Sequence, residues 1–159
     1  PWCSIIYDKA DGVGILFKND QVTVIKKREI IPGRLLLVDC FYQNHKFRLI
    51  NVYTSQQFKK KCKLLRKMRE ILTVNYTTII CGDFNIITEE KDRIASTVYK
   101  TSKEGKLLKE ISQEHDLIDA FRALNPNVYG FTRYDSKSKT RIDRIYTSSN
   151  VKILSYKPS

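Results

Sequence analysis

The sequence has no hydrophobic run long enough to cross a membrane, and its first residues show no signal-peptide pattern. A transmembrane helix needs about 20 consecutive apolar residues, and a signal peptide needs an apolar core behind a basic start. On these residues we expect no membrane partner and an intracellular location. The chain begins at Pro1 and not at Met, so we also expect a piece of a longer protein.

Metal-binding cysteine patterns are also missing. The four cysteines, Cys3, Cys40, Cys62 and Cys81, have no Cys-x-x-Cys spacing and no neighbouring pair of histidines. Structural zinc sites need such ligands at short spacings, so we expect no zinc site. Three of the four lie among apolar residues, which is typical of small buried side chains in a reducing compartment.

The sequence further lacks a complete dinucleotide-binding fingerprint, internal repeats and linker-like segments. Gly12-Val13-Gly14 is followed by neither a third glycine nor a helical pattern, and the fingerprint requires both. A length of 159 residues is within the usual range of one domain. We therefore predict a single domain over residues 1–159.

Acidic residues are scarce relative to basic ones. The chain has 29 Lys and Arg against 17 Asp and Glu, for a formal net charge of +12. An excess of this size favours an anionic partner. Nucleic acid is the leading candidate and an acidic membrane surface the weaker one, while a soluble basic protein without such a partner stays open.

Hydrophobic periodicity predicts a mixture of strands and helices. In the first third we expect an antiparallel meander. Apolar residues at steps of three and four predict a helix from Phe58 to Leu72, with Ser55 as its N-cap. We predict further helices over 103–115 and, in part, 116–124, a turn-like segment over 86–101 and a charged turn over 135–139. The predicted strands are 12–17, 21–31, 34–42, 47–53, 76–85, 130–134 and 141–146.

Six lysine and arginine residues occupy the remaining positions of the first predicted helix: Lys59, Lys60, Lys61, Lys63, Arg66 and Lys67. A basic face of this kind is usually solvated, but it can also contact phosphate groups. The sequence leaves both interpretations open.

The most informative stretch runs from Thr77 to Asn85. A short β-branched run predicts a buried strand, which ends in Gly82-Asp83-Phe84-Asn85. Because strand side chains alternate between faces, Asp83 and Asn85 are expected on the same side. The alternative is an Asx-type turn in which both residues bind local backbone.

Polar pairs end two further predicted strands, Asn51 with Tyr53 and Arg141 with Asp143. If the three strand ends converge, the site holds two carboxylates, two carboxamides, a phenol and a guanidinium. It holds no Ser or Cys nucleophile beside a base. This set suits hydrolysis of a phosphate ester by water with a divalent cation. For Asp143 alone, an ion pair with Arg141 or Arg144 is a serious alternative.

The ordered motifs Asn51-Val52-Tyr53, Gly82-Asp83-Phe84-Asn85 and Thr140-Arg141-Ile142-Asp143 resemble the endonuclease/exonuclease/phosphatase family. The chain is most similar to the apurinic-type endonuclease domain of LINE-type (non-LTR) retrotransposon polyproteins. The segment Asp116 to Arg122 followed by Leu124-Asn125-Pro126 resembles the same branch.

This resemblance implies an α/β fold, a DNase I-like sandwich of two packed, mostly antiparallel β-sheets flanked by helices. It implies DNA as the partner, nuclear action on chromosomal DNA, and a parent polyprotein that carries a reverse transcriptase. Catalytic roles would fall on Asp83, which acts on the attacking water, on Asn85 and Tyr53, which contact the phosphate, and on Asp143, which supports a histidine.

The resemblance also places Thr132, Arg141 and Arg93 at the DNA. Mg²⁺, or Mn²⁺, would be bound by Asp83 and Asn85. The sequence has Arg133 where the family usually has an aromatic residue, and Thr54-Ser55-Gln56 where it has Ala-Pro-Asn.

Three family elements have no counterpart in this sequence: a metal-binding Glu, an upstream Asn and a closing Ser-Asp-His. We therefore expect a domain incomplete at both termini, a weakly held metal and little or no activity of the chain by itself. Two alternatives are a non-catalytic nucleic-acid-binding remnant and a phosphatase of the same fold acting on inositol phosphates or phospholipids.

Overall fold

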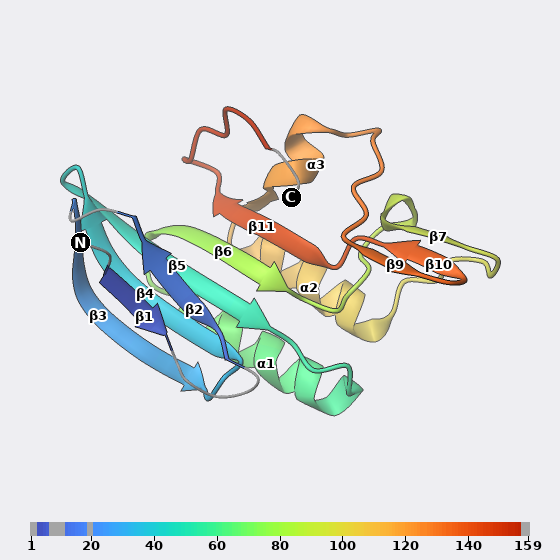
Figure 1. Ribbon diagram of the computed structural model, residues 1–159, viewed down its shortest axis with the longest axis horizontal. Helices are drawn as coiled ribbons and strands as arrows, with labels where there is room; N and C mark the ends of the chain where they lie inside the picture. Colours follow the sequence, from blue (N-terminus) through green and yellow to red (C-terminus); the bar gives the residue numbers. More distant parts are fainter. Residues whose placement is uncertain (1–2, 7–11, 19–20, 157–159) are drawn as a thin grey trace.

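A six-stranded sheet forms the centre of the molecule in the computed structural model, which describes residues 3–6, 12–18 and 21–156 (Figure 1). Its strand order is β3-β4-β5-β6-β11-β8. Only the β5–β6 pair is parallel, because helix α1 connects these two strands; the other neighbours are antiparallel. The strands are β3 (Val22–Ile31), β4 (Leu35–Tyr42), β5 (His45–Tyr53), β6 (Thr77–Asp83), β8 (Leu117–Asp119) and β11 (Asp143–Ser148).

Strands β3, β4 and β5 form the predicted antiparallel meander. The β4–β5 turn is tight because Gln43 and Asn44 both adopt positive φ, of 49° and 64°, the combination found in type I′ hairpins. Every residue of β4 from Leu35 to Cys40 is buried. Burial of consecutive residues means that both faces of this strand are covered.

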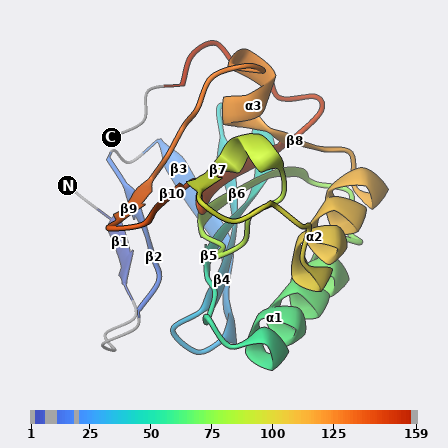
Figure 2. The ribbon, with the colours of Figure 1, turned by 90° about the vertical axis from the view of Figure 1, so that its right-hand side faces the viewer.

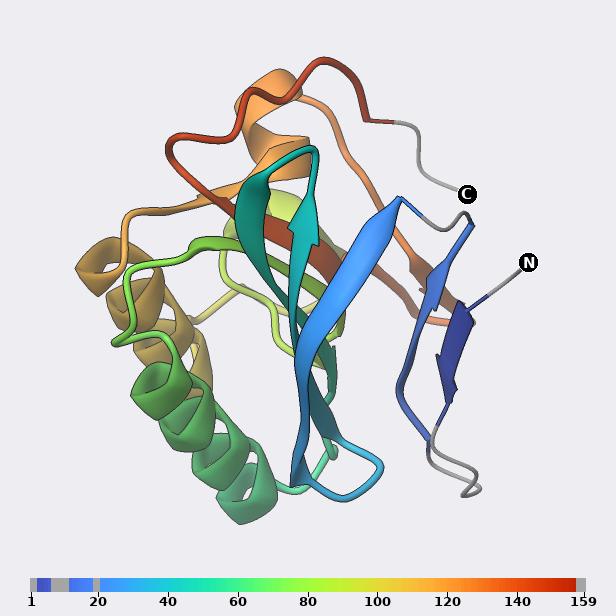
Figure 3. The same cartoon turned by 90° about the vertical axis from the view of Figure 1, so that its left-hand side faces the viewer.

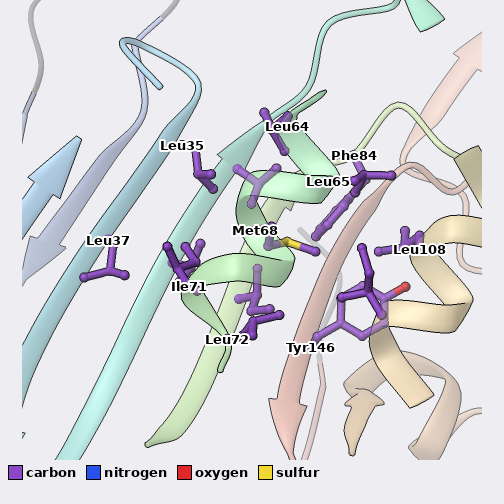
Figure 4. Packing of buried hydrophobic residues seen from close by; sticks show 14 of the residues in the cluster. Leu35, Leu37, Leu64, Leu65, Met68, Ile71, Leu72, Phe84, Leu108 and Tyr146 are labelled. Atoms are coloured by element: carbon purple, nitrogen blue, oxygen red, sulfur yellow. The ribbon is translucent and has the colours of Figure 1, made fainter. Parts of the chain in front are cut away.

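Helices α1 (Phe58–Ile71) and α2 (Lys103–Glu114) cover one face of the sheet (Figure 2). Leu65 and Met68 of α1 pack with Ile80, Phe84 and Tyr146 in the larger core (Figure 4). Within the described part of the chain, neither these helices nor any other is long and apolar enough to span a membrane.

The predicted limits of α1 are nearly correct, but two details of the prediction are wrong. Phe58 was assigned to the apolar stripe and is 49% exposed. Gln57, not Ser55, is the N-cap and makes no side-chain capping bond. The Ser55 hydroxyl instead accepts a hydrogen bond from the Gln57 N–H at 3.2 Å, within the loop before the helix.

The hairpin of β1 (Cys3–Ile6) and β2 (Gly14–Phe17) covers the opposite face of the sheet (Figure 3). Val13 and Phe17 pack against Leu36, Val38 and Cys40 in a second core. Strands thus lie on one side of the central sheet and helices on the other, as the predicted sandwich requires. The ends of the predicted domain, residues 1–2 and 157–159, lie outside the described residues.

A small three-stranded sheet, of order β7-β10-β9, lies near the end of the molecule to which β6 points (Figure 1). The predictions for this region are partly wrong: residues 86–101 contain regular structure, and the strand predicted over 130–134 begins later. The sequence does not mark the limits of these strands, because strands of three residues are too short to show an alternating pattern. The strands of the small sheet are β7 (Arg93–Ala95), β9 (Arg133–Asp135) and β10 (Ser138–Thr140). The short helix η1 (Glu90–Asp92) precedes β7 in the chain, and α3 (Ala120–Leu124) precedes β9.

Candidate active site

Three adjacent strands bring Tyr53, Asp83 and Asp143 together. In the parallel β5–β6 pair Tyr53 is the register partner of Asp83, and in the antiparallel β6–β11 pair Asp143 is the partner of Asp83. Residues in register on neighbouring strands point to the same face of a sheet. The predicted convergence is confirmed for Tyr53, Asp83 and Asp143 and is wrong for Asn51 and Arg141, whose side chains bind elsewhere.

Gly82 allows β5 and β6 to approach closely just before this site. A Cβ atom at this position would lie 1.9 Å from the Val52 carbonyl oxygen, and the Gly82 φ of 138° is one that side chains disfavour. The glycine of the Gly82-Asp83-Phe84-Asn85 motif is thus required by the backbone geometry.

Asp83 and Asn85 meet through a turn and not through strand alternation. Strand β6 ends at Asp83, and Asn85 adopts a positive φ of 47°. The Asn85 N–H donates to Asp83 Oδ1 at 2.8 Å, and its Nδ2 donates to Asp83 Oδ2 at 3.2 Å and to the Thr54 carbonyl at 3.0 Å. The Asx-type turn is therefore formed, and it orients the carboxylate at the strand end.

Tyr53 is half-buried, with the Arg34 guanidinium 4.4 Å from the centre of its ring. Asn51, two residues earlier on the same strand, donates from Nδ2 to the Gly14 carbonyl at 2.6 Å. Asn51 therefore joins β5 to β2, and we do not count it among the groups of the site.

Thr132 lies beside Asp143. Its hydroxyl oxygen accepts hydrogen bonds from the N–H groups of Ile142 and Asp143, at 3.2 and 3.1 Å. Its own N–H donates to the Thr140 carbonyl at 2.9 Å. Thr132 thus fixes the backbone that carries Asp143, and its exposure is consistent with the predicted position near DNA.

The surroundings of Asp83 raise the pKa of its carboxyl group. Burial is the largest cause, and the nearby negative charge of Asp143 acts in the same direction. The Asn85 N–H, Arg133 and Lys61 oppose it by favouring the charged form. A carboxylate with a raised pKa binds a proton more readily, as a general base acting on water requires.

Arg141 and Arg144 do not pair with Asp143, so that alternative is excluded. Both point to Asp92 and Asp119 on the other side of the strand, and Arg141 is only 2% exposed. The prediction that Arg141 contacts DNA is therefore wrong for this conformation. Arg141 precedes β11, so strand alternation does not place it on the face of Asp143, and its guanidinium lies in a buried cluster of charges instead.

This buried charge cluster contains two carboxylates and three guanidinium groups. Asp92, which is fully buried, lies 2.8 Å from Arg122, 2.7 Å from Arg141 and 2.8 Å from Arg144. Asp119 binds Arg141 through both oxygens, at 3.0 and 2.8 Å. The cluster ties η1, β8 and α3 to β11, the strand that begins with Asp143.

Asp92 and Asp119 remain ionised in this cluster. Burial alone raises the pKa of each carboxyl group, but the arginines outweigh it and hold both values below the usual range. No local spacing pattern marks Asp92 or Asp119 as buried charges, because Asp92 meets Arg141 and Arg144 from 49 and 52 residues away in the chain.

Arg93, predicted to contact DNA, lines a cavity of about 310 Å³ that also includes Asn85, Arg133 and Ile142. Its Nη2 donates to the Thr97 hydroxyl. Arg93 is half-buried. The structure thus places it close to Asn85, where a cation can contact an anionic substrate.

Lys61 was assigned to the exposed basic face and is instead 6% exposed. Its Nζ donates to the Asn85 carbonyl at 2.6 Å and lies 3.5 Å from Glu104. The sequence spacing does indicate that Lys61 is buried, because it precedes Leu64, Leu65 and Met68 by three, four and seven positions. These positions lie on the same helical stripe.

Comparison with known proteins decides the family. The sequence profile described as "Endonuclease/Exonuclease/phosphatase family" matches residues 2–158. The chain belongs to this family. A relative among curated proteins, the "Transposon TX1 uncharacterized 149 kDa protein" of Xenopus laevis, is 30% identical over 148 residues. That match covers 88% of this chain but 11% of the relative.

Solved structures confirm the predicted fold. The endonuclease domain of TRAS1, a telomere-specific non-LTR retrotransposon, superposes with a TM-score of 0.68 at 15% identity, covering 94% of this chain and 66% of that one. An AP endonuclease from Leishmania major gives 0.70 at 17% identity, with coverage of 93% and 62%. The chain thus spans just under two thirds of these endonuclease/exonuclease/phosphatase structures.

The family site of this chain offers few metal ligands. The part of the chain that the structure describes has no group of three or more His, Cys, Asp or Glu side chains that could hold a metal ion. Asp83, Asn85 and Asp143 present carboxylate and carboxamide oxygens, which are ligands that Mg²⁺ accepts alongside several waters. The side-chain oxygens of Asp83 and Asn85 are therefore of the type that Mg²⁺ prefers.

Neither of the two histidines of this chain lies at the site of Asp83 and Asp143. His115 lines a cavity of about 490 Å³ with Thr77, Thr78 and Ser148, beside the amino-terminal end of β6. His45 begins β5, whose other end carries Tyr53. Both positions are at the opposite end of the sheet from Asp143, so neither is the histidine that Asp143 is predicted to support.

Proposed function

We propose that this chain is the central part of a retrotransposon endonuclease domain that nicks DNA by hydrolysing a phosphodiester bond. The observation that carries the proposal is the register of Tyr53, Asp83 and Asp143 at one end of three adjacent strands. The net charge of +12 supports an anionic polymer as substrate. The transposon protein and the TRAS1 domain among the relatives support the same class.

In the proposed reaction Asp83 accepts a proton from the water that attacks phosphorus. The raised pKa of its carboxyl group favours this transfer. Asn85 keeps the carboxylate oriented through its two hydrogen bonds. Tyr53 would donate its hydroxyl to a phosphate oxygen as negative charge develops, which is the usual role of a fixed donor.

Asp83 and Asn85 would hold a Mg²⁺ or Mn²⁺ ion. When bound, such an ion polarises the phosphoryl group and stabilises the developing charge. Because two protein ligands are few, we propose that the ion is held weakly. Isothermal titration with Mg²⁺ tests this: a submicromolar dissociation constant for the 159-residue chain would contradict it.

A nicking assay on supercoiled plasmid tests the function. We expect the longer polypeptide that contains these residues to nick DNA in the nucleus, where chromosomal DNA is its substrate. Asp83→Ala and Asp143→Ala should each lower the rate by at least about 100-fold, because members of a catalytic unit act together. Glu70→Ala, which removes an exposed carboxylate of α1 that pairs with Lys67, is the matched control. Equal rates for all three variants would refute the proposal.

For the 159-residue chain alone we propose little or no nicking. Within the described ranges, Asp143 has no histidine beside it and the metal ligands are few. Rapid nicking by this chain, abolished by Asp83→Ala, would show that the described residues suffice.

A non-catalytic DNA-binding remnant is the second candidate, because Arg133 occupies the position where the family usually has an aromatic residue. Binding through basic residues alone would weaken steeply with salt and would not change on Asp83→Ala. A salt titration of DNA binding beside the nicking assay separates the two candidates.

A further inference from the structure

We infer that Lys61 is a positioning residue for the Asp83 carboxylate: its buried ammonium group fixes the turn that carries Asp83 and Asn85. The inference rests on the proposed function, in which Asp83 acts on the attacking water. It assigns a task in the site to a residue of helix α1, which carries no residue of the family motifs.

The position of Lys61 is unusual for a lysine. An ammonium group is costly to bury unless polar partners replace water. Lys61 has two such partners at the site: the Asn85 carbonyl, at 2.6 Å from Nζ, and Glu104 of α2, at 3.5 Å. The Glu104 side chain is itself only 17% exposed. The lysine is therefore held by the turn on one side and by α2 on the other.

The turn that Lys61 binds is the one that orients Asp83. Asn85 has a left-handed backbone, with a φ of 47°, a conformation that asparagine adopts in turns more readily than most residues do. From this backbone Asn85 donates to both oxygens of Asp83, at 2.8 and 3.2 Å. Release of the Asn85 carbonyl by Lys61 would free the turn and loosen both bonds to the carboxylate.

Two substitutions separate this role from simple packing. Lys61→Met keeps the apolar stem of the side chain and removes the charge and the donor. Lys61→Arg keeps both. Lys63→Met, two residues along the same helix at an exposed position, is the matched control for loss of one positive charge.

Hydrogen exchange of the Asn85 N–H, followed by NMR in the 159-residue chain, decides the question, because this N–H donates to Asp83 Oδ1. Asn85→Asp identifies its signal. We expect Lys61→Met to speed this exchange by about tenfold or more, and Lys61→Arg and Lys63→Met to leave it within error. A folded Lys61→Met variant with an unchanged exchange rate would overturn the inference, as would an equal acceleration in Lys63→Met.

If Lys61→Met does not fold, Glu104→Gln gives the answer, because it removes the ion pair that holds Lys61 from α2. Glu104→Gln should then also speed the exchange of the Asn85 N–H, and an unchanged rate would overturn the inference. In a nicking assay, Lys61→Met should lower kcat about tenfold with little change in KM, while Lys61→Arg retains the rate. Absence of nicking by the unsubstituted longer polypeptide would refute the proposed function, and the exchange rate of the Asn85 N–H would still decide the role of Lys61.

Discussion

The buried charge cluster around Asp92 makes a specific prediction about stability. Asp92→Asn keeps the size of the side chain but leaves Arg141 and Arg144 with Asp119 and Arg122 with Glu89, at 3.6 Å. Removing one partner of a buried ion pair typically costs about 3–5 kcal/mol, because the remaining charges are left uncompensated. Asp92 is fully buried, and its three guanidinium contacts are 2.7–2.8 Å long. We therefore expect the free energy of unfolding to fall by about 3–5 kcal/mol.

This loss is large relative to the stability of a typical domain, which is about 5–15 kcal/mol. For a chain of this size each kcal/mol corresponds to roughly 2–4 °C in Tm, so we expect Tm to fall by about 6–20 °C. Thermal and urea unfolding followed by circular dichroism at pH 7 measures both quantities.

Asp135→Asn is the matched control for Asp92→Asn. Asp135 pairs with Arg133 at 3.1 Å, but the two side chains are 46% and 43% exposed. Exposed pairs contribute about 0–1 kcal/mol, so this variant should unfold near the wild-type temperature. If Asp92→Asn were no less stable than Asp135→Asn, the argument that the cluster holds η1, α3 and β11 together would be wrong.

The same cluster sets the acid stability of the protein. The pKa values of Asp92 and Asp119 are lower in the folded state than in the unfolded chain. Their contribution to the free energy of unfolding is therefore fully present above the pKa of the unfolded chain, near pH 4. It is lost as the pH falls through the pKa values of the folded state. We expect the free energy of unfolding to decrease below about pH 4 in wild type and to decrease less in Asp92→Asn.

Three further outcomes are expected. Gly82→Ala should lose several kcal/mol or fail to fold, because the new Cβ would lie 1.9 Å from the Val52 carbonyl oxygen; wild-type urea unfolding would contradict this. Asp143→Asn should lower the pKa of Asp83 in an NMR titration, since it removes a charge that raises it; a rise would contradict the assignment. Arg93→Ala should reduce the salt slope of DNA binding by about 1, and an unchanged slope in anisotropy titrations would remove Arg93 from the interface.

Part of the site was predictable because its residues lie at the ends of strands. A β-branched run followed by Gly82-Asp83 marks where β6 ends, and the similar pattern before Tyr53 marks the end of β5. The alternation rule failed for Asn85 and for Arg141, since one lies in a turn after its strand and the other precedes its strand. Alternation holds only within the extended backbone.

The sequence by itself determined the order of most strands and helices, the apolar face of α1 and the positions of Tyr53, Asp83 and Asp143 as strand-end residues. These features follow from local periodicity and from the backbone limits of glycine, which act over a few residues. The tertiary structure alone decided which charges are buried together. Asp92 meets Arg141 and Arg144 across 49 and 52 residues of chain, and Lys61 meets Asn85 across 24. Such partners are chosen by the packing of whole elements, which no local pattern records.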